Sequence, residues 1–419
     1  MCRHANRDPG DYNRSSSGLI AVAGLRVDND EGATAIATPS HCLAGSSDRD
    51  AWRRYVTVCA FIIALCIALK LPSLFFPRAE YDERIYWSVT RNWLGNGSYS
   101  LQGMPILGEL PPATYDRPLF HHPPLLPMLL APFVAADSPR LAILPSWLGH
   151  VLAVIGVAMV SWTWRRRCWG ATHLLLWLPV LAVALDPLMT FCSRRIWPDN
   201  LVGGFAGLSL GMLCMAVERR CVGWAAAAGV SLGLAALAKL PALALIPAGI
   251  LLIFMAPAIE SARRRRLLLA HLLAAGIVVA PWFIVFHAKY GVFTPDWIRP
   301  EAALVATSAH IARAMSQPWH YYLSQSILIA PVVLLTLAAA LLQFRRLAAQ
   351  RLAVPSAWMV LPWLALLVMW LQGYSQQMRF LTPAVPALYV LLGSLLARAH
   401  PRRSLLPLLA LLAVLYGAV

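Results

Sequence analysis

The sequence predicts an all-α protein that crosses a membrane about eleven times and has two further helices lying along the membrane surface. Of its 419 residues, 59% are hydrophobic and 13% are charged, whereas a soluble domain carries about 25% charged residues. Apolar runs of about 17–25 residues, long enough to cross a bilayer as a helix, recur along the chain. These runs lack the alternation of barrel strands, so the spans are predicted to be helical.

The first 54 residues differ in composition from the rest of the chain. Residues 1–54 are rich in Ser, Gly, Asp and Arg and contain few large apolar side chains, which is typical of a disordered tail. No apolar core follows the basic start, as it would in a signal peptide. The seven Arg in this tail predict a cytoplasmic location. Residues 55–419 then form the expected membrane domain.

Basic residues indicate which loops lie on which side of the membrane. A first span at 56–76 leads into an outer loop at 77–140, which contains an apolar segment at 121–136. If that segment crossed the membrane, the Arg cluster at 165–167 and every later basic cluster would lie outside, against the positive-inside rule. This Pro-rich run is also short for a span, so we place it along the outer surface.

The remaining spans follow from the same hydropathy pattern. They are predicted at 141–164, 171–191, 200–217, 222–238, 241–259, 267–287, 322–344, 354–372, 380–398 and 404–419. This arrangement places the N-terminus inside and the C-terminus outside. A second long outer loop is expected at 288–321.

The net charge of +16 does not indicate nucleic-acid binding, because most of the Arg fall in the predicted cytoplasmic tail and loops. The eight Cys show neither CxxC nor metal-ligand spacing. We interpret them as free apolar thiols without a disulfide framework. The expected partners are therefore membrane lipids and no nucleic acid.

Acidic residues gather on the predicted outer side. Of the twelve acids beyond the tail, ten lie outside or near outer helix ends. Asp82 and Glu83 begin a helical pattern in the first outer loop, and Asp199 begins a span entering from outside. An acid buried at a membrane boundary is costly, so all three are candidate catalytic residues. Each also fits a purely structural role as a helix-start or N-cap carboxylate.

Basic side chains and one His pair accompany these acids. Four cations occupy predicted outer positions: Arg194, Arg195, Lys239 and Arg379. Each is a candidate for binding phosphate, and each is also explained as an interfacial anchor. The His121-His122-Pro123-Pro124 sequence makes His122 a candidate metal or acceptor ligand together with Glu83.

Taken in order, these motifs resemble the GT-C membrane glycosyltransferases, in particular the branch of protein O-mannosyltransferases and lipid A aminoarabinose transferases. The resemblance covers about residues 55–398. Its motifs are Asp82-Glu83, His122-Pro123-Pro124-Leu125, Ser193-Arg194 with Asp199, Ala238-Lys239-Leu240-Pro241, Pro281-Trp282, and Arg379 to Pro386.

The resemblance implies a polyprenyl-phosphate sugar donor, hexosyl or pentosyl, and a lipid, glycan or protein acceptor at the outer face of the membrane. The high Ala and Arg content and the compact loops indicate a bacterial inner membrane. It implies that Asp82 acts as general base with inversion at the anomeric carbon. Glu83, Asp199 and His122 are the implied second contributors or metal ligands. The donor phosphate is expected to be bound by cations, namely Lys239, Arg379 and Arg194, or by a divalent metal ion.

Two alternatives remain open from the sequence. A transporter or lipid flippase would need paired charges or broken helices deep in the spans. The ionisable groups within the spans are few: Lys70, His150, Asp186 and His271. A non-catalytic scaffold would not require an Asp-Glu loop with a distant Asp199. The discriminating observation is whether the carboxylates of Asp82 and Asp199 face one outer cavity.

Overall fold

The computed structural model describes residues 46–75, 81–103, 123–168, 173–256, 259–291 and 377–396, and eight isolated positions between 318 and 364. All regular elements in these ranges are helices. Five are long and apolar enough to cross a membrane: Asp50–Leu74, Leu141–Trp164, Leu176–Ser193, Asp199–Arg219 and Ser261–Lys289. This supports the predicted integral membrane protein. The spans predicted at 322–344, 354–372 and 404–419 lie outside the described residues, so the total of eleven remains a prediction.

The first span begins earlier than the sequence predicts. Helix α1 (Ser46–Ala68) starts at Ser46 rather than at residue 56 and is followed by the short 3-10 helix η1 (Leu71–Leu74). Residues 46–54 are polar, so hydropathy assigned them to the tail although they continue the helix of the span. The rest of the tail, and most of the second long loop predicted at 288–321, lie outside the described residues.

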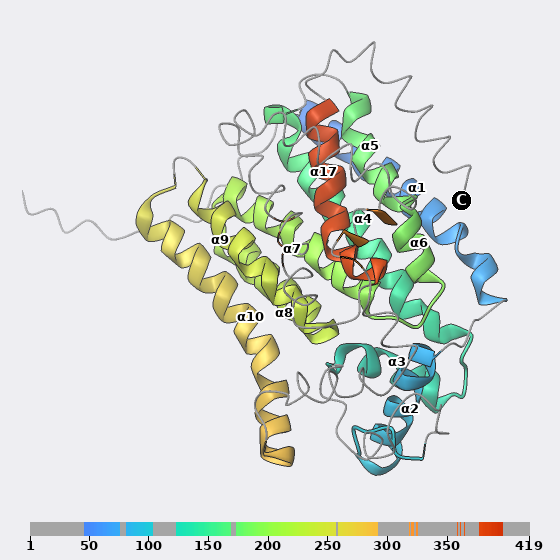
Figure 1. Cartoon of the computed structure of the whole chain (residues 1–419). Coiled ribbons are helices and arrows are strands. Elements are labelled where there is room, and N and C mark those ends of the chain that lie inside the picture. The colour runs from blue at the N-terminus through green and yellow to red at the C-terminus, as the bar shows by residue number, and fades with distance from the viewer. Residues whose placement is uncertain are drawn as a thin grey trace, which may run out of the picture. The chain divides into compact units, whose positions relative to one another are not determined.

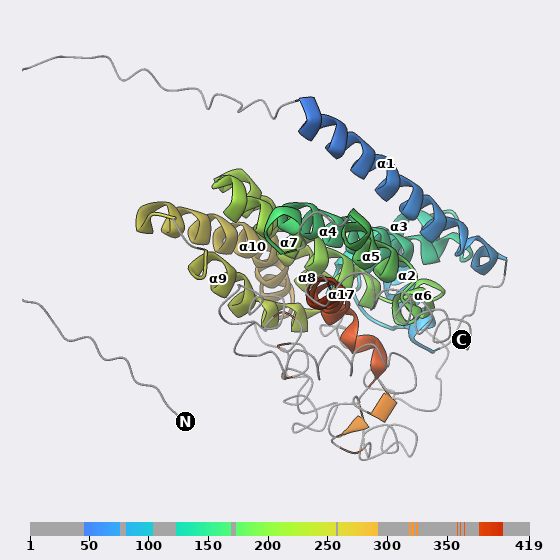
Figure 2. The same cartoon turned by 90° about the horizontal axis from the view of Figure 1, so that it is seen from above.

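Four helices pack one against the next. Helix α4 (Leu144–Cys168), entered through η3 (Leu141–Ile143), packs along α7 (Asp199–Arg219). Helix α7 packs on α8 (Val222–Ala238), and α8 packs on α10 (Ser261–Tyr290). Only α7 and α8 are consecutive spans, because one further span separates α4 from α7 in the chain and another separates α8 from α10 (Figure 1). Figure 2 shows α4 with α7 on one side and α5 on the other.

Glycines allow α4 and α7 to approach each other closely. A Cβ on Gly149 would lie 2.3 Å from the backbone of Asn200, and one on Gly204 would lie 2.0 Å from the carbonyl oxygen of Gly149. Gly156 and Gly207 repeat this contact two turns further along. Membrane helices use small residues in this way because close backbone packing replaces the missing hydrophobic driving force.

The Gly204→Ala variant is expected to destabilise the bundle by about 1–3 kcal/mol, because its methyl group displaces the backbone of α4. Thermal unfolding in detergent, followed by size-exclusion chromatography, measures the effect. Gly276→Ala is the matched control, since nothing lies within 4 Å of a Cβ at that position of α10. A melting temperature for Gly204→Ala equal to that of the wild type would contradict the close α4–α7 contact.

The span predicted at 171–191 contains a break. It consists of α5 (His173–Ala184) and α6 (Pro187–Ser193). Between them, the Asp186 carboxylate accepts a hydrogen bond from the Met189 backbone N–H at 2.7 Å and one from the Tyr389 hydroxyl at 2.8 Å. Asp186 is therefore the N-cap of α6, a structural role.

Two later spans begin with 3-10 segments. The span predicted at 241–259 consists of η4 (Leu240–Leu245) and α9 (Ile246–Phe254). The span predicted at 380–398 consists of η5 (Met378–Ala384) and α17 (Val385–Leu396). The tighter turns include Pro241 and Pro383, which lack the N–H that an α-helix interior would need. These segments place polar side chains at the start of each span.

Two short helices separate the first two spans, as predicted. They are α2 (Tyr81–Asn96) and α3 (Leu125–Ala135), and they pack against each other. Both lie at one end of the long helices (Figure 1). The loop after α2 is tied to α10, because Tyr99 packs on Trp282 with ring centroids 5.1 Å apart and Lys289 Nζ donates to a carbonyl of that loop. Residues 104–122, which connect the loop after α2 to α3, lie outside the described residues.

Candidate active site

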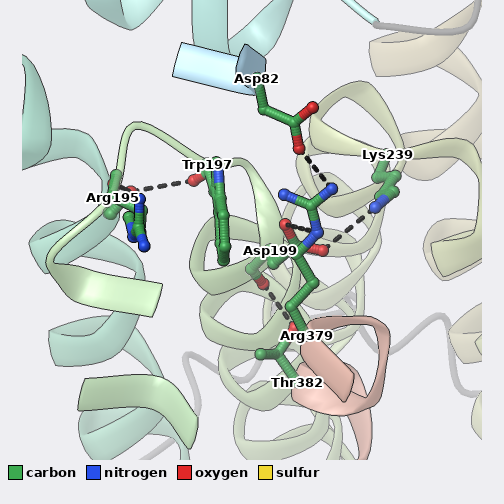
Figure 3. Close-up of polar contacts among 8 residues, drawn as sticks. Asp82, Arg195, Trp197, Asp199, Lys239, Arg379 and Thr382 are labelled. Carbon is green, nitrogen blue, oxygen red and sulfur yellow. Dashed lines mark hydrogen bonds and ion pairs between the residues drawn. The ribbon is translucent and has the colours of Figure 1, made fainter. Parts of the chain in front are cut away.

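Four segments that are distant in the chain meet at the end of the bundle where α2 and α3 pack. The start of α7 contributes Asp199, and the residue after α8 contributes Lys239. The start of η5 contributes Arg379, and the start of α2 contributes Asp82. Figure 3 shows these four side chains pointing toward one another. The carboxylates of Asp82 and Asp199 both face the guanidinium of Arg379.

Arg379 bridges the two carboxylates. Its Nη2 forms an ion pair with Asp82 Oδ2, and its Nε lies 3.8 Å from Asp199 Oδ2. Lys239 Nζ donates to Asp199 Oδ1 at 3.1 Å. Two acids and two cations make these four groups neutral in sum. Asp199 is 2% exposed and Arg379 11%, while Lys239 is 22% and Asp82 29% exposed, so Asp82 and Lys239 are the groups most open to a ligand.

The two central groups keep unused hydrogen-bonding capacity. Asp199 Oδ2 and Arg379 Nε are both buried, and neither has a hydrogen-bond partner in the described part of the chain. Their separation of 3.8 Å exceeds hydrogen-bonding distance. A buried donor and acceptor in this state are costly. A bound polar group that reaches them would lower that cost.

Aromatic rings and a threonine surround these charges. The Arg379 guanidinium carbon lies 4.1 Å from the centroid of the Trp197 ring, and Lys239 Nζ lies 3.6 Å from that of Phe380. Thr382 Oγ1 donates to the Asp199 backbone oxygen at 2.7 Å. No role was predicted for Trp197, Phe380 or Thr382 from the sequence. The available signals were a Trp two positions before Asp199 and a Phe directly after Arg379.

Two other predicted site residues pair separately from this cluster. Glu83 Oε1 lies 3.4 Å from Arg195 Nη1, with side-chain exposures of 1% and 6%. Arg194, which the sequence analysis favoured for phosphate binding, is exposed. The turn therefore directs Arg195 inward and Arg194 outward. His122 lies outside the described residues, so its predicted role is untested.

The protonation of two neighbours follows from their surroundings. Burial raises the pKa of the Tyr86 phenol well above its usual value, and the Asp82 and Asp199 carboxylates raise it further. Tyr86 therefore stays neutral and forms part of the apolar wall beside Asp82. Burial lowers the pKa of Lys239, whereas the adjacent Asp199 carboxylate opposes that shift. Asp199 thus helps to keep Lys239 protonated.

The divalent metal ion considered from the sequence stays a prediction, because its predicted ligand His122 lies outside the described residues. They include no group of three His, Cys, Asp or Glu side chains arranged to hold a metal. Asp82 and Asp199 face Arg379, and Glu83 faces Arg195. The chemistry derived below therefore uses only this chain's own side chains.

The fold is similar to those of solved membrane-protein structures. Neither a protein-family model nor a curated protein matches the sequence. The structure of ArnT from Cupriavidus metallidurans bound to undecaprenyl phosphate matches with a TM-score of 0.58 and 20% identity, over 84% of this chain and 63% of that one. The apo form of the same protein matches with a TM-score of 0.54 and 19% identity, over 81% and 60%.

A second solved membrane protein also has a similar fold. The oligosaccharyltransferase AglB from Archaeoglobus fulgidus, in complex with an inhibitory peptide and a dolichol-phosphate, matches with a TM-score of 0.52 and 15% identity, over 87% of this chain and 52% of that one. ArnT and AglB are both GT-C superfamily members. The chain therefore has the fold of these two proteins, as the resemblance implied. It spans less than two thirds of either protein.

Proposed function

We propose that this protein transfers a sugar from a polyprenyl-phosphate-linked donor to a lipid, glycan or protein acceptor at the outer face of the membrane. The observation that supports this most directly is the contact of Arg379 with both Asp82 and Asp199, beside Lys239. The fold adds support, because ArnT is bound to undecaprenyl phosphate and AglB to a dolichol-phosphate.

The cations suit the leaving group of such a reaction. A polyprenyl-phosphate sugar is a phosphodiester with one negative charge, and the departing polyprenyl phosphate gains another as its bond to the sugar breaks. Fixed cations at this position stabilise the transition state more than the ground state. We assign Arg379 and Lys239 to this role, since the planar fork of Arg matches two phosphate oxygens.

Asp82 is the proposed general base. The acceptor hydroxyl or amine attacks the anomeric carbon from the face opposite the phosphate. As the new bond forms, the bond between the anomeric carbon and the phosphate oxygen breaks, so the configuration inverts. The acceptor proton passes to the Asp82 carboxylate. With 29% of its side chain exposed, Asp82 is the more accessible of the two acids at the cluster.

Arg379 links the two ends of this reaction. Before transfer, its guanidinium faces the charged Asp82 carboxylate. When Asp82 takes the acceptor proton it becomes neutral, and at the same moment the phosphate gains one negative charge. The total charge around Arg379 is unchanged, and its guanidinium is released from one anion as the other forms. Asp199 remains charged throughout and holds Lys239 and Arg379 in place.

A transfer assay tests this function. Purified protein in proteoliposomes receives polyprenyl phosphates that carry radiolabelled pentoses or hexoses, with extracted envelope lipids, glycans and proteins as acceptors. We expect label in an acceptor fraction and an equal amount of released polyprenyl phosphate. Movement of the labelled lipid across the bilayer without transfer would instead favour the flippase alternative and overturn the proposal.

The Asp199→Asn variant is expected to lose donor binding at a lower pH than the wild type. Burial lowers the pKa of Lys239 and the Asp199 carboxylate raises it, so removing that carboxylate lowers the pKa further. Donor binding that needs protonated Lys239 is present below this pKa and lost as pH rises through it. The alkaline limb of a plot of 1/KM for the donor against pH should therefore move to lower pH. A limb at an unchanged pH would contradict the role of Asp199.

A further inference from the structure

The Trp197 indole lies between two arginines. The Arg379 guanidinium carbon is 4.1 Å from its ring centroid and the Arg195 guanidinium carbon is 5.3 Å from it. Figure 3 shows the ring between the two side chains, with Arg195 on one side and Arg379 on the other. A guanidinium over an indole face gains about 0.5–2 kcal/mol, and more as water is excluded.

Two guanidinium groups on opposite faces of one ring repel each other, and a carboxylate beside each of them offsets this repulsion. Arg195 has Glu83 at 3.4 Å, and Arg379 has Asp82 and Asp199. The order of groups is therefore carboxylate, guanidinium, indole, guanidinium, carboxylate. The two outer carboxylates, Glu83 and Asp82, are consecutive residues at the start of α2. The first turn of α2 thus supplies the carboxylate at each end of this row of groups, Glu83 beside Arg195 and Asp82 beside Arg379.

The turn that carries Arg195 and Trp197 is held firmly. Ser146 Oγ on α4 lies 2.7 Å from the Arg195 carbonyl oxygen and 2.9 Å from that of Trp197, and it donates toward both. Phe191 packs edge-on against Trp197 with ring centroids 5.7 Å apart. The indole is therefore a fixed surface on which Arg379 rests. In-plane movement of the guanidinium, from Asp82 toward a phosphate, would keep this contact.

We propose that Glu83, Arg195 and Trp197 form a positioning device that sets the Arg379 guanidinium for the donor phosphate. In this arrangement Glu83 acts through Arg195, and it binds neither acceptor nor metal. The inference rests on the proposed function, because it assigns the phosphate to Arg379. It assigns different roles to the two acids at the start of α2: Asp82 is the proposed base, and Glu83 positions Arg195.

Substitution of Trp197 separates donor binding from the chemical step. Trp197→Leu keeps an apolar side chain but removes the ring, and we expect the donor KM to rise about tenfold while the acceptor KM stays within about twofold. Trp197→Phe keeps an aromatic face and should restore most of the donor affinity. An unchanged donor KM in Trp197→Leu would overturn the proposal.

A double-mutant cycle provides a second test that does not depend on Trp197→Leu folding. Glu83→Gln and Arg195→Gln should each raise the donor KM, and the double variant should be no worse than the poorer single one, because both act through one contact. If the two effects multiply, or if Glu83→Gln raises the acceptor KM, Glu83 has an independent role and the inference fails. Failure of the proposed function differs from both results, since the wild type would then transfer no sugar.

Discussion

Asp82→Asn is expected to abolish sugar transfer, lowering kcat by about 10²–10⁴-fold while the protein still folds and inserts. The Asn amide has nearly the shape of the carboxylate, but it is too weak a base to take the proton from the attacking hydroxyl or amine. The loss of charge next to Arg379 should cost little stability, because Asp82 is 29% exposed and Arg379 keeps Asp199. Initial rates at saturating donor measure the effect, with size-exclusion chromatography as the folding check.

Asp137→Asn is the matched control for this experiment. Asp137 follows α3, its side chain is 84% exposed, and it pairs with Arg91 at 3.8 Å. The same chemical change at an exposed ion pair should leave transfer unaffected, since such pairs contribute about 0–1 kcal/mol. Turnover by Asp82→Asn at the rate of the wild type would remove Asp82 from the role of base.

Arg379→Gln is expected to weaken binding of polyprenyl phosphate and to lower transfer by about 10²–10³-fold. The variant should also be less stable by about 1–3 kcal/mol, because it leaves the buried Asp199 with Lys239 as its remaining cation. Two measurements separate these effects. Titration with polyprenyl phosphate reports affinity, and thermal unfolding without ligand reports stability.

Two further variants show whether the planar fork or only the charge of Arg379 matters. Arg379→Lys keeps a positive charge but loses the fork and the flat contact with Trp197, so affinity should recover only in part. Arg91→Gln, at the exposed pair with Asp137, should bind polyprenyl phosphate as the wild type does. Full affinity in Arg379→Gln would show that the phosphate binds elsewhere.

Helices and their approximate bounds follow from the sequence where one physical property dominates. The span predicted at 222–238 corresponds to α8 (Val222–Ala238), and that at 200–217 to α7 (Asp199–Arg219). In both, a long apolar run has polar ends. The helical pattern that begins at Asp82 predicted α2, and Arg counting placed the apolar segment at 121–136, which contains α3, along the surface.

Breaks within apolar runs were not predicted, for a specific reason. Asp186 lies between α5 and α6. Its carboxylate accepts hydrogen bonds from the Met189 backbone N–H and from the Tyr389 hydroxyl, and it thereby caps the start of α6. Tyr389 is distant in the chain, and hydropathy averaged over a span is insensitive to one capped turn. The start of α1 was misplaced for the related reason that polar residues can continue a helix beyond the apolar run.

By itself, the sequence predicted that Asp82, Asp199, Lys239 and Arg379 lie at the outer ends of helices, because hydropathy and basic clusters indicate topology. Only the tertiary structure decided which of them touch. It joined Arg379 to both acids and placed the Trp197 ring between two guanidinium groups. It also paired the Glu83 carboxylate with the Arg195 guanidinium. Such pairing depends on side-chain directions and on distances of a few ångströms between segments far apart in the chain, and a linear pattern of polarity carries neither.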